Sequence, residues 1–516
     1  MSVASLLAAA DTVPAPDVEW SALSPFLVVV VGACLLLPIA GLLPRRTRVA
    51  WSALFTIAVA LGAIGASAWV WHDLSRVGPT ERTTVAGAYA VDKFSLFLIV
   101  VICVGVILAT LLTEGYLRRE DLPGAEAYLL YLASASGAII MVTAADLIVL
   151  FIGLEVLSIA AYVLAGLHRR RLRSGEAALK YFVLGGFSSA FFLYGVALIY
   201  GATGTTNLVG IAEYLATHRL LDEGLLLAGI GLLIVGFAFK VGGVPFHVWT
   251  PDVYQGSPSP VVAFMASVVK AAAFAGMLRV VVVALSTHRL DWQPILYAIA
   301  VLSMIVGAVL AVVQSDVKRM LAYSSINHAG FMLAAVSTGA DEGIAAVLFY
   351  LAAYTVLIGG TFGIVTLFGR RGDGHHDIDD YRGLARREPF LALALTIFLL
   401  AQAGTPLTAG FLAKFYVIQA VVDAGSWWLG LVAMLAATIS AFLYLRIVLT
   451  MYAGVTDADV EVAEPTAEPV RRIHVPLGAK VAIAAALVLT IAIGVVPDPL
   501  THASRTARPE LVAPGD

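Results

Sequence analysis

Residues 224–279 read GLLLAGIGLLIVGFAFKVGGVPFHVWTPDVYQGSPSPVVAFMASVVKAAAFAGMLR. They form two apolar runs joined by a segment rich in Gly, Pro and aromatic residues, and each run carries one lysine, Lys240 or Lys270. A lysine near the centre of a membrane span costs roughly 2.5–3.5 kcal/mol on insertion scales, so its presence needs a functional reason. We predict two membrane helices whose lysines take part in proton movement.

The composition of the whole chain is that of a polytopic membrane protein. Of its 516 residues, 60% are hydrophobic and only 13% are charged, which excludes an ordinary soluble protein. The net charge is −3, and the basic residues are scattered over short loops, which argues against binding to nucleic acid. Two cysteines, Cys34 and Cys103, are too few to ligate an iron–sulfur cluster within this chain.

Fourteen apolar segments along the chain are long enough to cross a bilayer as helices. Because an open sheet cannot satisfy its backbone hydrogen bonds in lipid, we predict an all-α polytopic fold with about 14 transmembrane helices. The predicted spans are residues 24–43, 51–71, 93–113, 127–144, 146–167, 177–201, 224–243, 257–284, 293–314, 319–338, 342–369, 388–422, 427–453 and 477–497.

Lys and Arg residues between the spans predict the orientation of the chain. Nineteen of them fall in alternate loops on one side and seven on the other, and the richer side is expected to be cytoplasmic. Both termini are then predicted to lie outside the cytoplasm. The expected location is the inner (plasma) membrane of the cell.

Two of the predicted spans are interrupted. The run 388–422 is too long for one crossing and contains the break Gly404–Gly410, with Lys414 just past it, and the run 224–243 ends at Lys240–Pro245. Paired interruptions in two parts of a membrane protein point to inverted repeats and an ion path. We therefore predict two inverted five-helix repeats with broken helices. The predicted division is 1–126 (flanking helices), 127–284 (first repeat), 285–453 (second repeat) and 454–516 (cytoplasmic loop, last helix and short tail).

Six ionisable residues within the spans carry the functional hypothesis. Glu155 lies near the middle of its span and Lys180 near the start of the next, so antiparallel packing would allow an ion pair that a further proton weakens. Four more then follow, one per span, as a relay of titratable groups requires: Lys240, Lys270, His328 and Lys414.

Each of these residues also has a purely structural alternative. Lys180 lies close to an arginine-rich loop, so its ammonium can snorkel to the interface, and His328 can be a hydrogen-bonded core residue. Arg279 and Arg446 lie nearer the ends of their spans and are predicted to be structural. The segment Gly374–Asp380 contains two His and three Asp residues, but its polar context favours a solvated loop over a metal site.

Four motifs resemble those of the antiporter-like membrane subunits of proton-pumping NADH-quinone oxidoreductase, respiratory complex I. They are LEVLSIAAYVLAG (154–166), KVGGVPFHVWTPDVYQGSPSPVVAFMASVVKAAAF (240–274), DVKRMLAYSSINHAGFML (316–333) and GTPLTAGFLAKFYV (404–417). The similarity extends from about residue 95 to 453. Within the family the chain is most similar to subunit N, because it ends soon after the fourteenth span and carries a lysine, Lys414, in the late interrupted span.

The resemblance implies a function and a set of site residues. Glu155 and Lys180 match the charge pair of the family, Lys240, Lys270 and Lys414 match its pumping and connecting lysines, and His328 matches a histidine on the connecting axis. It implies a translocase subunit that moves protons through this relay, driven by quinone reduction elsewhere. The expected partners are the lipid bilayer and other membrane-arm subunits of complex I; FMN, iron–sulfur clusters and quinone are expected in those partner subunits, and no cofactor in this chain.

Two alternatives share part of this evidence. A subunit of a multi-chain monovalent cation/proton antiporter has the same superfamily motifs, and would exchange sodium without redox partners. A membrane scaffold with no transport role would keep its function after the membrane lysines were neutralised.

Overall fold

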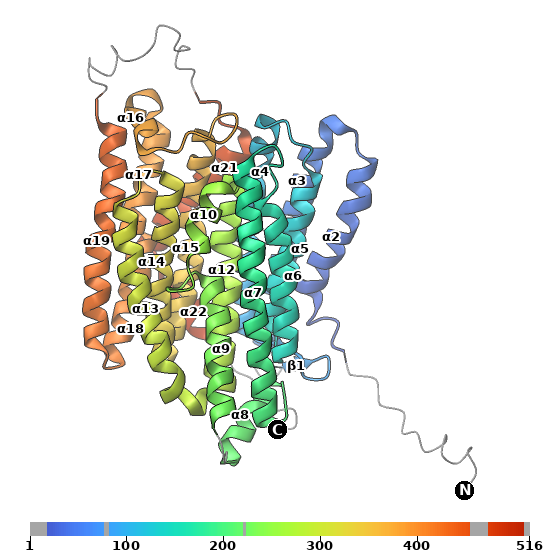
Figure 1. Cartoon of the computed structure of the whole chain (residues 1–516). Coiled ribbons are helices and arrows are strands. Elements are labelled where there is room, and N and C mark those ends of the chain that lie inside the picture. Colours follow the sequence, from blue (N-terminus) through green and yellow to red (C-terminus); the bar gives the residue numbers. More distant parts are fainter. Residues whose placement is uncertain (1–17, 77–81, 220–222, 455–472, 510–516) are drawn as a thin grey trace.

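Long apolar helices make up most of the protein, and they run side by side along a common axis (Figure 1). The computed structural model describes residues 18–76, 82–219, 223–454 and 473–509. Within these residues, twelve helices are long and apolar enough to cross a membrane. The other two predicted spans correspond to α14 and to the pair α17 and α18, so the all-α polytopic fold with about 14 crossings is confirmed.

The first two helices, α2 and α3, form one edge of the bundle, and α4 lies further inside it (Figure 1). An antiparallel hairpin of two short strands follows the first two helices, and its Tyr89 makes a bridge to Ala144 at the end of α5. The Asp92 carboxylate caps the next helix by accepting a hydrogen bond from the Ser95 N–H at 2.8 Å. The elements are α2 (Ser24–Leu42), α3 (Arg45–Leu74), β1 (Arg82–Thr84), β2 (Tyr89–Val91) and α4 (Lys93–Arg119).

The next group of helices contains the first break. Here α9 ends at Val241, and the next residue, Gly242, has a φ of 78°, a left-handed conformation that favours glycine. The indole N–H of Trp249 donates a hydrogen bond of 2.9 Å to the Phe239 carbonyl and so satisfies a group at the broken end. The elements are α5 (Ala125–Thr143), α6 (Leu147–Ala165), α7 (Leu172–Thr203), α8 (Leu208–Thr217), α9 (Gly224–Val241), α10 (Trp249–Gly256), α11 (Ser259–Phe264), η1 (Met265–Val269), α12 (Lys270–Leu278) and η2 (Arg279–Ala284).

The following group repeats this arrangement with the second break. Here α17 ends at Ala403 and is followed by Gly404, which has a φ of 101°. The next helix, α18, begins after Thr408, whose hydroxyl accepts a hydrogen bond from the Phe411 N–H. The elements are η3 (Ser286–His288), α13 (Arg289–Val312), α14 (Val317–Ser337), α15 (Asp341–Phe368), η4 (Ile378–Tyr381), α16 (Leu384–Arg387), α17 (Pro389–Ala403), α18 (Ala409–Asp423) and α19 (Trp427–Tyr452). The chain ends with α21 (Leu477–Val495) and α22 (Asp498–Thr506).

The two groups share a packing detail as well as a break. A Cβ on Gly137 of α5 would strike the Leu157 backbone in α6, and one on Gly307 of α13 would strike the Asn327 backbone in α14. The first helix pair of each group therefore packs backbone against backbone. Because each group crosses the membrane five times, the second begins at the opposite end from the first, as inverted repeats require.

Hydrogen bonds and ion pairs join the loops that the sequence places on one side. The Gly372 N–H donates to Glu120 at 2.8 Å, and Asp373 pairs with Arg171 at 3.0 Å and with Lys318 at 3.3 Å. These arginine- and lysine-rich loops define one end of the bundle, here called the basic end. Four of the loop regions that the sequence places on one side therefore lie together at this end.

Candidate functional site

Lys240 lies in the last turn of α9, directly before the first break, and only 2% of it is exposed. Its ammonium donates to the Ser158 hydroxyl at 2.5 Å and to the Tyr162 hydroxyl at 3.3 Å, both on α6. The same ammonium lies 5.3 Å from the centre of the Tyr162 ring. A lysine in a helix that is apolar elsewhere thus has polar and aromatic partners from the neighbouring helix.

Glu155 lies on the same face of α6, one turn before Ser158. The side chain is half-buried, and its Oε1 atom has no hydrogen-bond partner among the described residues. The carboxylate is close enough to Lys240 for their charges to interact. The structure therefore groups Glu155 with Lys240 rather than with Lys180.

The predicted ion pair between Glu155 and Lys180 is wrong for this structure. The Lys180 ammonium instead pairs with Glu176 at 2.7 Å, one turn earlier on α7, and with Asp252 of α10 at 2.8 Å. Asp252 also binds Arg319 at 2.6 Å. Asp252 reaches Lys180 because α10, the short helix after the first break, packs against α7. The sequence alone did not place this helix beside α7.

Lys270 begins α12, immediately after the π-helical turn η1. Its ammonium donates to the Ser325 hydroxyl at 2.6 Å and to the Ser325 carbonyl at 2.7 Å. Tyr254 of α10 reaches the same hydroxyl at 3.3 Å, and the Tyr354 ring lies 5.5 Å from the ammonium. Single π-helical turns often mark functional positions, and this one precedes a buried lysine.

His328 lies in the middle of α14, with 2% of its surface exposed. Its Nδ1 is 2.6 Å from the Tyr350 hydroxyl and its Nε2 is 3.0 Å from the Tyr444 hydroxyl, which in turn is 2.5 Å from the Ser324 hydroxyl. The ring is therefore hydrogen-bonded on both sides, as a core histidine would be. Its partners are hydroxyls that both donate and accept, which is also what proton transfer needs.

Lys414 lies in α18, shortly after the second break, and is 5% exposed. Its ammonium donates a hydrogen bond of 3.0 Å to the Ala403 carbonyl at the broken end of α17. It also lies 5.3 Å from the ring of Phe331, one turn after His328 on α14. The charges of Lys270 and Lys414 both act on His328, so these three groups form one electrostatic unit.

The six predicted residues thus fall into two buried clusters and one more exposed pair. The first cluster is Glu155 with Lys240, the second is Lys270 with His328 and Lys414, and Lys180 pairs with Asp252 outside both. Among the described residues no hydrogen bond joins Lys240 to Lys270. A proton passing between the clusters would therefore need intervening water or a side-chain movement.

Sequence reasoning missed the hydroxyls that connect these groups. Ser158 is three residues after Glu155, and Ser324 and Ser325 are four and three residues before His328, spacings that place them on the same helical faces. This spacing was the available signal for the serines. The tyrosines come from other helices, so no local pattern reveals them: Tyr254, Tyr350 and Tyr444.

A buried ionic cluster at the basic end was also missed. Asp373 is fully buried and pairs with Lys318, Arg171 and His376, the last at 2.9 Å. Burial alone would raise the pKa of Asp373, but the charges of Lys318 and Arg171 and the hydrogen bond with His376 outweigh burial and hold this pKa below its usual range. The segment predicted to be a solvated loop is therefore partly buried, with His376 only 4% exposed and His375 outside the cluster.

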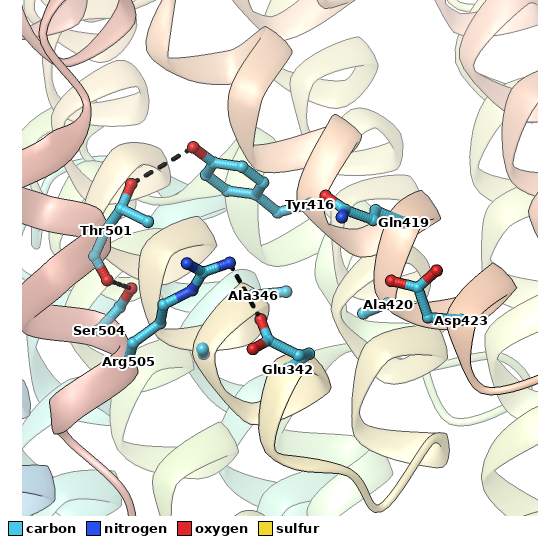
Figure 2. Close-up of a pocket in the computed structure, with 10 residues that line it drawn as sticks. Glu342, Ala346, Tyr416, Gln419, Ala420, Asp423, Thr501, Ser504 and Arg505 are labelled. Atoms are coloured by element: carbon cyan, nitrogen blue, oxygen red, sulfur yellow. Dashed lines mark hydrogen bonds and ion pairs between the residues drawn. The ribbon is translucent and has the colours of Figure 1, made fainter.

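A small polar pocket lies at the opposite end, between α15, α18 and α22 (Figure 2). Its wall includes Gln419 and Asp423, which lie on the part of α18 that follows Lys414. Figure 2 shows Arg505 directed at Glu342, with which it pairs at 3.3 Å. The helix that carries Lys414 therefore ends at a carboxylate-lined surface opening.

The sequence matches a known protein family over more than half of its length. Residues 144–440 match the family described as NADH:quinone oxidoreductase/Mrp antiporter, TM. The chain is 40% identical to NADH-quinone oxidoreductase subunit N of Rhodococcus opacus over 537 aligned residues, which covers 95% of this chain and 96% of that protein.

Solved structures give the same result. A chain of respiratory complex I from Thermus thermophilus is 33% identical, with a TM-score of 0.77 and coverage of 93% of this chain and 99% of that one. A chain of the Mrp complex from Dietzia sp. has the same fold, with a TM-score of 0.82 over 95% of this chain and 97% of that chain, at 21% identity. The protein belongs to the NADH:quinone oxidoreductase/Mrp antiporter membrane family, and within that family to NADH-quinone oxidoreductase subunit N.

Proposed function

We propose that this chain is a proton-translocating subunit in the membrane arm of an NADH-quinone oxidoreductase. The observation that carries the proposal is the burial of three lysines, each held by hydroxyls or by a carbonyl at a helix break: Lys240, Lys270 and Lys414. Intramembrane ionisable residues are costly, and they commonly mark proton or ion paths. Lysine suits this role because, unlike arginine, it can release its proton when buried.

The first cluster suggests how a proton step is coupled to charge. While Glu155 is ionised, its charge favours the protonated form of Lys240. A proton that reaches Glu155 removes this attraction, and Lys240 then releases its proton more easily. Ser158 and Tyr162 offer hydroxyls to the departing proton at 2.5 and 3.3 Å.

The second cluster provides a path toward the other side of the membrane. Lys270 contacts the Ser325 hydroxyl, His328 contacts the hydroxyls of Tyr350 and Tyr444, and the charges of Lys270 and Lys414 both act on His328. Among the described residues no hydrogen bond links these three groups directly, so the proposed path between them also needs water or side-chain movement. Because the charges of both lysines act on His328, a proton gained at one lysine disfavours protonation of the histidine. Because of this repulsion, a proton that arrives at one group promotes the release of a proton from another group of the cluster.

The assembly and membrane placement are also part of the proposal. The chain would lie in the inner (plasma) membrane with its basic end in the cytoplasm and both termini outside, and would contact neighbouring antiporter-like and small membrane subunits. FMN, iron–sulfur clusters and the quinone site would belong to partner subunits. The functional units within the chain would be the helices of 127–284 and of 285–453, with 1–126 and 454–516 flanking them.

The decisive experiment is Lys240→Ala in the whole enzyme, with proton pumping and NADH oxidation measured in membrane vesicles. We expect pumping to fall strongly while the complex stays assembled. Lys480→Ala, which removes an exposed lysine at the start of α21, is the matched control and should pump normally. Normal pumping by Lys240→Ala would contradict the relay.

The same preparation tests the assembly. Co-purification of flavin, iron–sulfur clusters and about a dozen other chains supports a complex I subunit. A smaller assembly of membrane chains without redox centres, combined with sodium-dependent pH changes in vesicles, would show a cation/proton antiporter instead.

A further inference from the structure

A cavity of about 1150 Å³ opens at the basic end, between α4, α15 and α21. These three helices pack against one another, and α4 and α21 lie side by side near that end in Figure 1. The fourth wall is the segment 370–388, which connects α15 to α17. None of the six relay residues lines this cavity, so the function proposed above leaves it unexplained.

The cavity has an apolar lower wall and a charged rim. Leu112 of α4, Leu367 and Phe368 of α15 and Leu477 of α21 supply hydrocarbon surface. Leu477 is 76% exposed, so this surface continues to the outside of the bundle. An amphiphile whose chains lie along the outer face of α21 would fit this arrangement.

The acidic side chains in the rim already have partners. Glu114 pairs with Arg118 at 2.7 Å, the Glu388 carboxylate accepts a hydrogen bond from the Ile473 N–H at 3.0 Å, and Asp380 accepts one from the Asp377 N–H at 3.0 Å. Their negative charge is thus largely engaged within the protein.

Some of the arginine groups in the rim lack such partners. Within the described part of the chain, Arg370 and Arg387 make no ion pair, although the Arg387 guanidinium donates a hydrogen bond to the Arg382 carbonyl. The Nη2 atom of Arg119 is buried without a hydrogen-bond partner, although its Nε pairs with Glu120 at 2.9 Å. Two guanidinium groups without a carboxylate partner therefore line this cavity together with Arg119, a set of residues suited to a phosphate.

We propose that this cavity binds an anionic phospholipid. The headgroup phosphate would lie between Arg370, Arg387 and Arg119, and the acyl chains would follow Leu367, Phe368 and Leu477 toward the bilayer. Basic pockets between transmembrane helices at such an interface are suited to anionic headgroups. A small soluble anion would leave the apolar wall exposed to water. The ammonium group of a zwitterionic lipid would lie close to the arginines and be repelled by them.

The test uses the purified whole enzyme and two photoreactive lipids with the same diazirine acyl chain, one a phosphatidylglycerol and the other a phosphatidylcholine. After irradiation, the labelled residues of this chain are mapped by mass spectrometry. We expect phosphatidylglycerol to label residues 112–119, 366–368 and 473–479, and phosphatidylcholine to label them much less. An excess of glycerol phosphate, which has the headgroup without acyl chains, should not displace the lipid.

Two variants make the test specific. Arg370→Gln combined with Arg387→Gln should weaken phosphatidylglycerol binding by roughly 25-fold, about fivefold for each arginine near a membrane surface. Arg382→Gln is the matched control, because Arg382 is in the same segment but pairs with Asp379 at 3.1 Å and does not line the cavity. Equal labelling by both lipids, unchanged labelling of the double variant, or no labelling of these segments in the whole enzyme would each overturn the proposal.

Discussion

The ammonium of Lys270 donates hydrogen bonds to both the side-chain hydroxyl and the backbone carbonyl of Ser325, at 2.6 and 2.7 Å. One residue of α14 thus holds the lysine at two points, and the same helix carries His328 one turn later. The carbonyl favours the charged lysine, whereas the hydroxyl can serve the charged or the neutral form because it donates as well as accepts. The Ser325 hydroxyl is therefore the part of this contact that is suited to proton transfer.

Ser325→Ala should slow proton pumping while leaving the carbonyl contact in place. A hydrogen bond to a charged group contributes about 1.5–3 kcal/mol, so we expect pumping and coupled turnover to fall on the order of tenfold. Ser337→Ala is the control, because the Ser337 hydroxyl is in the same helix but bonds only the Ala334 carbonyl, at 2.8 Å. The comparison is made in vesicles by the initial rate of NADH-driven acidification. An equal loss of pumping in both variants would mean that a disturbance of the helix, and not the loss of the Ser325 hydroxyl, causes the effect.

Tyr444→Phe should uncouple His328 from Ser324. The Tyr444 hydroxyl is 3.0 Å from His328 Nε2 and 2.5 Å from the Ser324 hydroxyl, so its removal breaks both contacts with no change in ring size. We expect a several-fold loss of pumping with normal assembly. Tyr452→Phe, on the exposed end of the same helix, should have no effect. Full pumping by Tyr444→Phe would remove this hydroxyl from the path.

The architecture could be predicted from the sequence because membrane helices are recognisable from the length and composition of their apolar segments. All fourteen apolar segments became helices, and both breaks fall where Gly and Pro lie beside a lysine. Side-chain pairing was harder to predict. Lys180 pairs with Asp252 because α10 folds back beside α7, and a contact between residues 72 positions apart leaves no local signal.

The buried cluster around Asp373 illustrates the same limit. Its members Arg171, Lys318 and His376 come from three separate parts of the chain, and each alone looks like a solvated loop residue. Burial of Arg279 was missed for the same reason: it pairs with Asp92 at 2.8 Å inside the bundle. The positions of the charged residues could be read from the sequence, but their ion-pair partners could be identified only from the folded structure.

Gly404→Ala should disturb Lys414 through the second break. Gly404 has a φ of 101°, so a side chain there is strained by about 1–2 kcal/mol, and its Cβ would lie 3.3 Å from Lys414 Cδ. Gly425→Ala separates the two effects, because Gly425 also has a positive φ, 79°, but no atom near its added Cβ. We expect both variants to lower thermal stability slightly and only Gly404→Ala to reduce pumping. Equal pumping by the two variants would argue against a need for this lysine position.

Asp373→Asn should destabilise the basic end of the bundle. The substitution leaves the fully buried Lys318 without its carboxylate, and removal of one partner from a buried ion pair typically costs about 3–5 kcal/mol. Asp379→Asn is the control, because Asp379 is 80% exposed where it pairs with Arg382, and its loss should cost less than about 1 kcal/mol. Stability is followed as the temperature at which the tagged chain is lost from the detergent-soluble enzyme.

The stability lost in Asp373→Asn should depend on pH in a defined direction. Because the folded protein holds the pKa of Asp373 below its ordinary value of about 3.9, the carboxylate contributes its full stability above that pH and loses it as the pH falls through the folded pKa. Burial also lowers the pKa of His376 from its ordinary value. The contribution of this carboxylate to the difference between wild type and Asp373→Asn should therefore be constant above about pH 7 and shrink only in strong acid. A difference that disappears near neutral pH would show that Asp373 is protonated in the folded protein and does not neutralise Lys318.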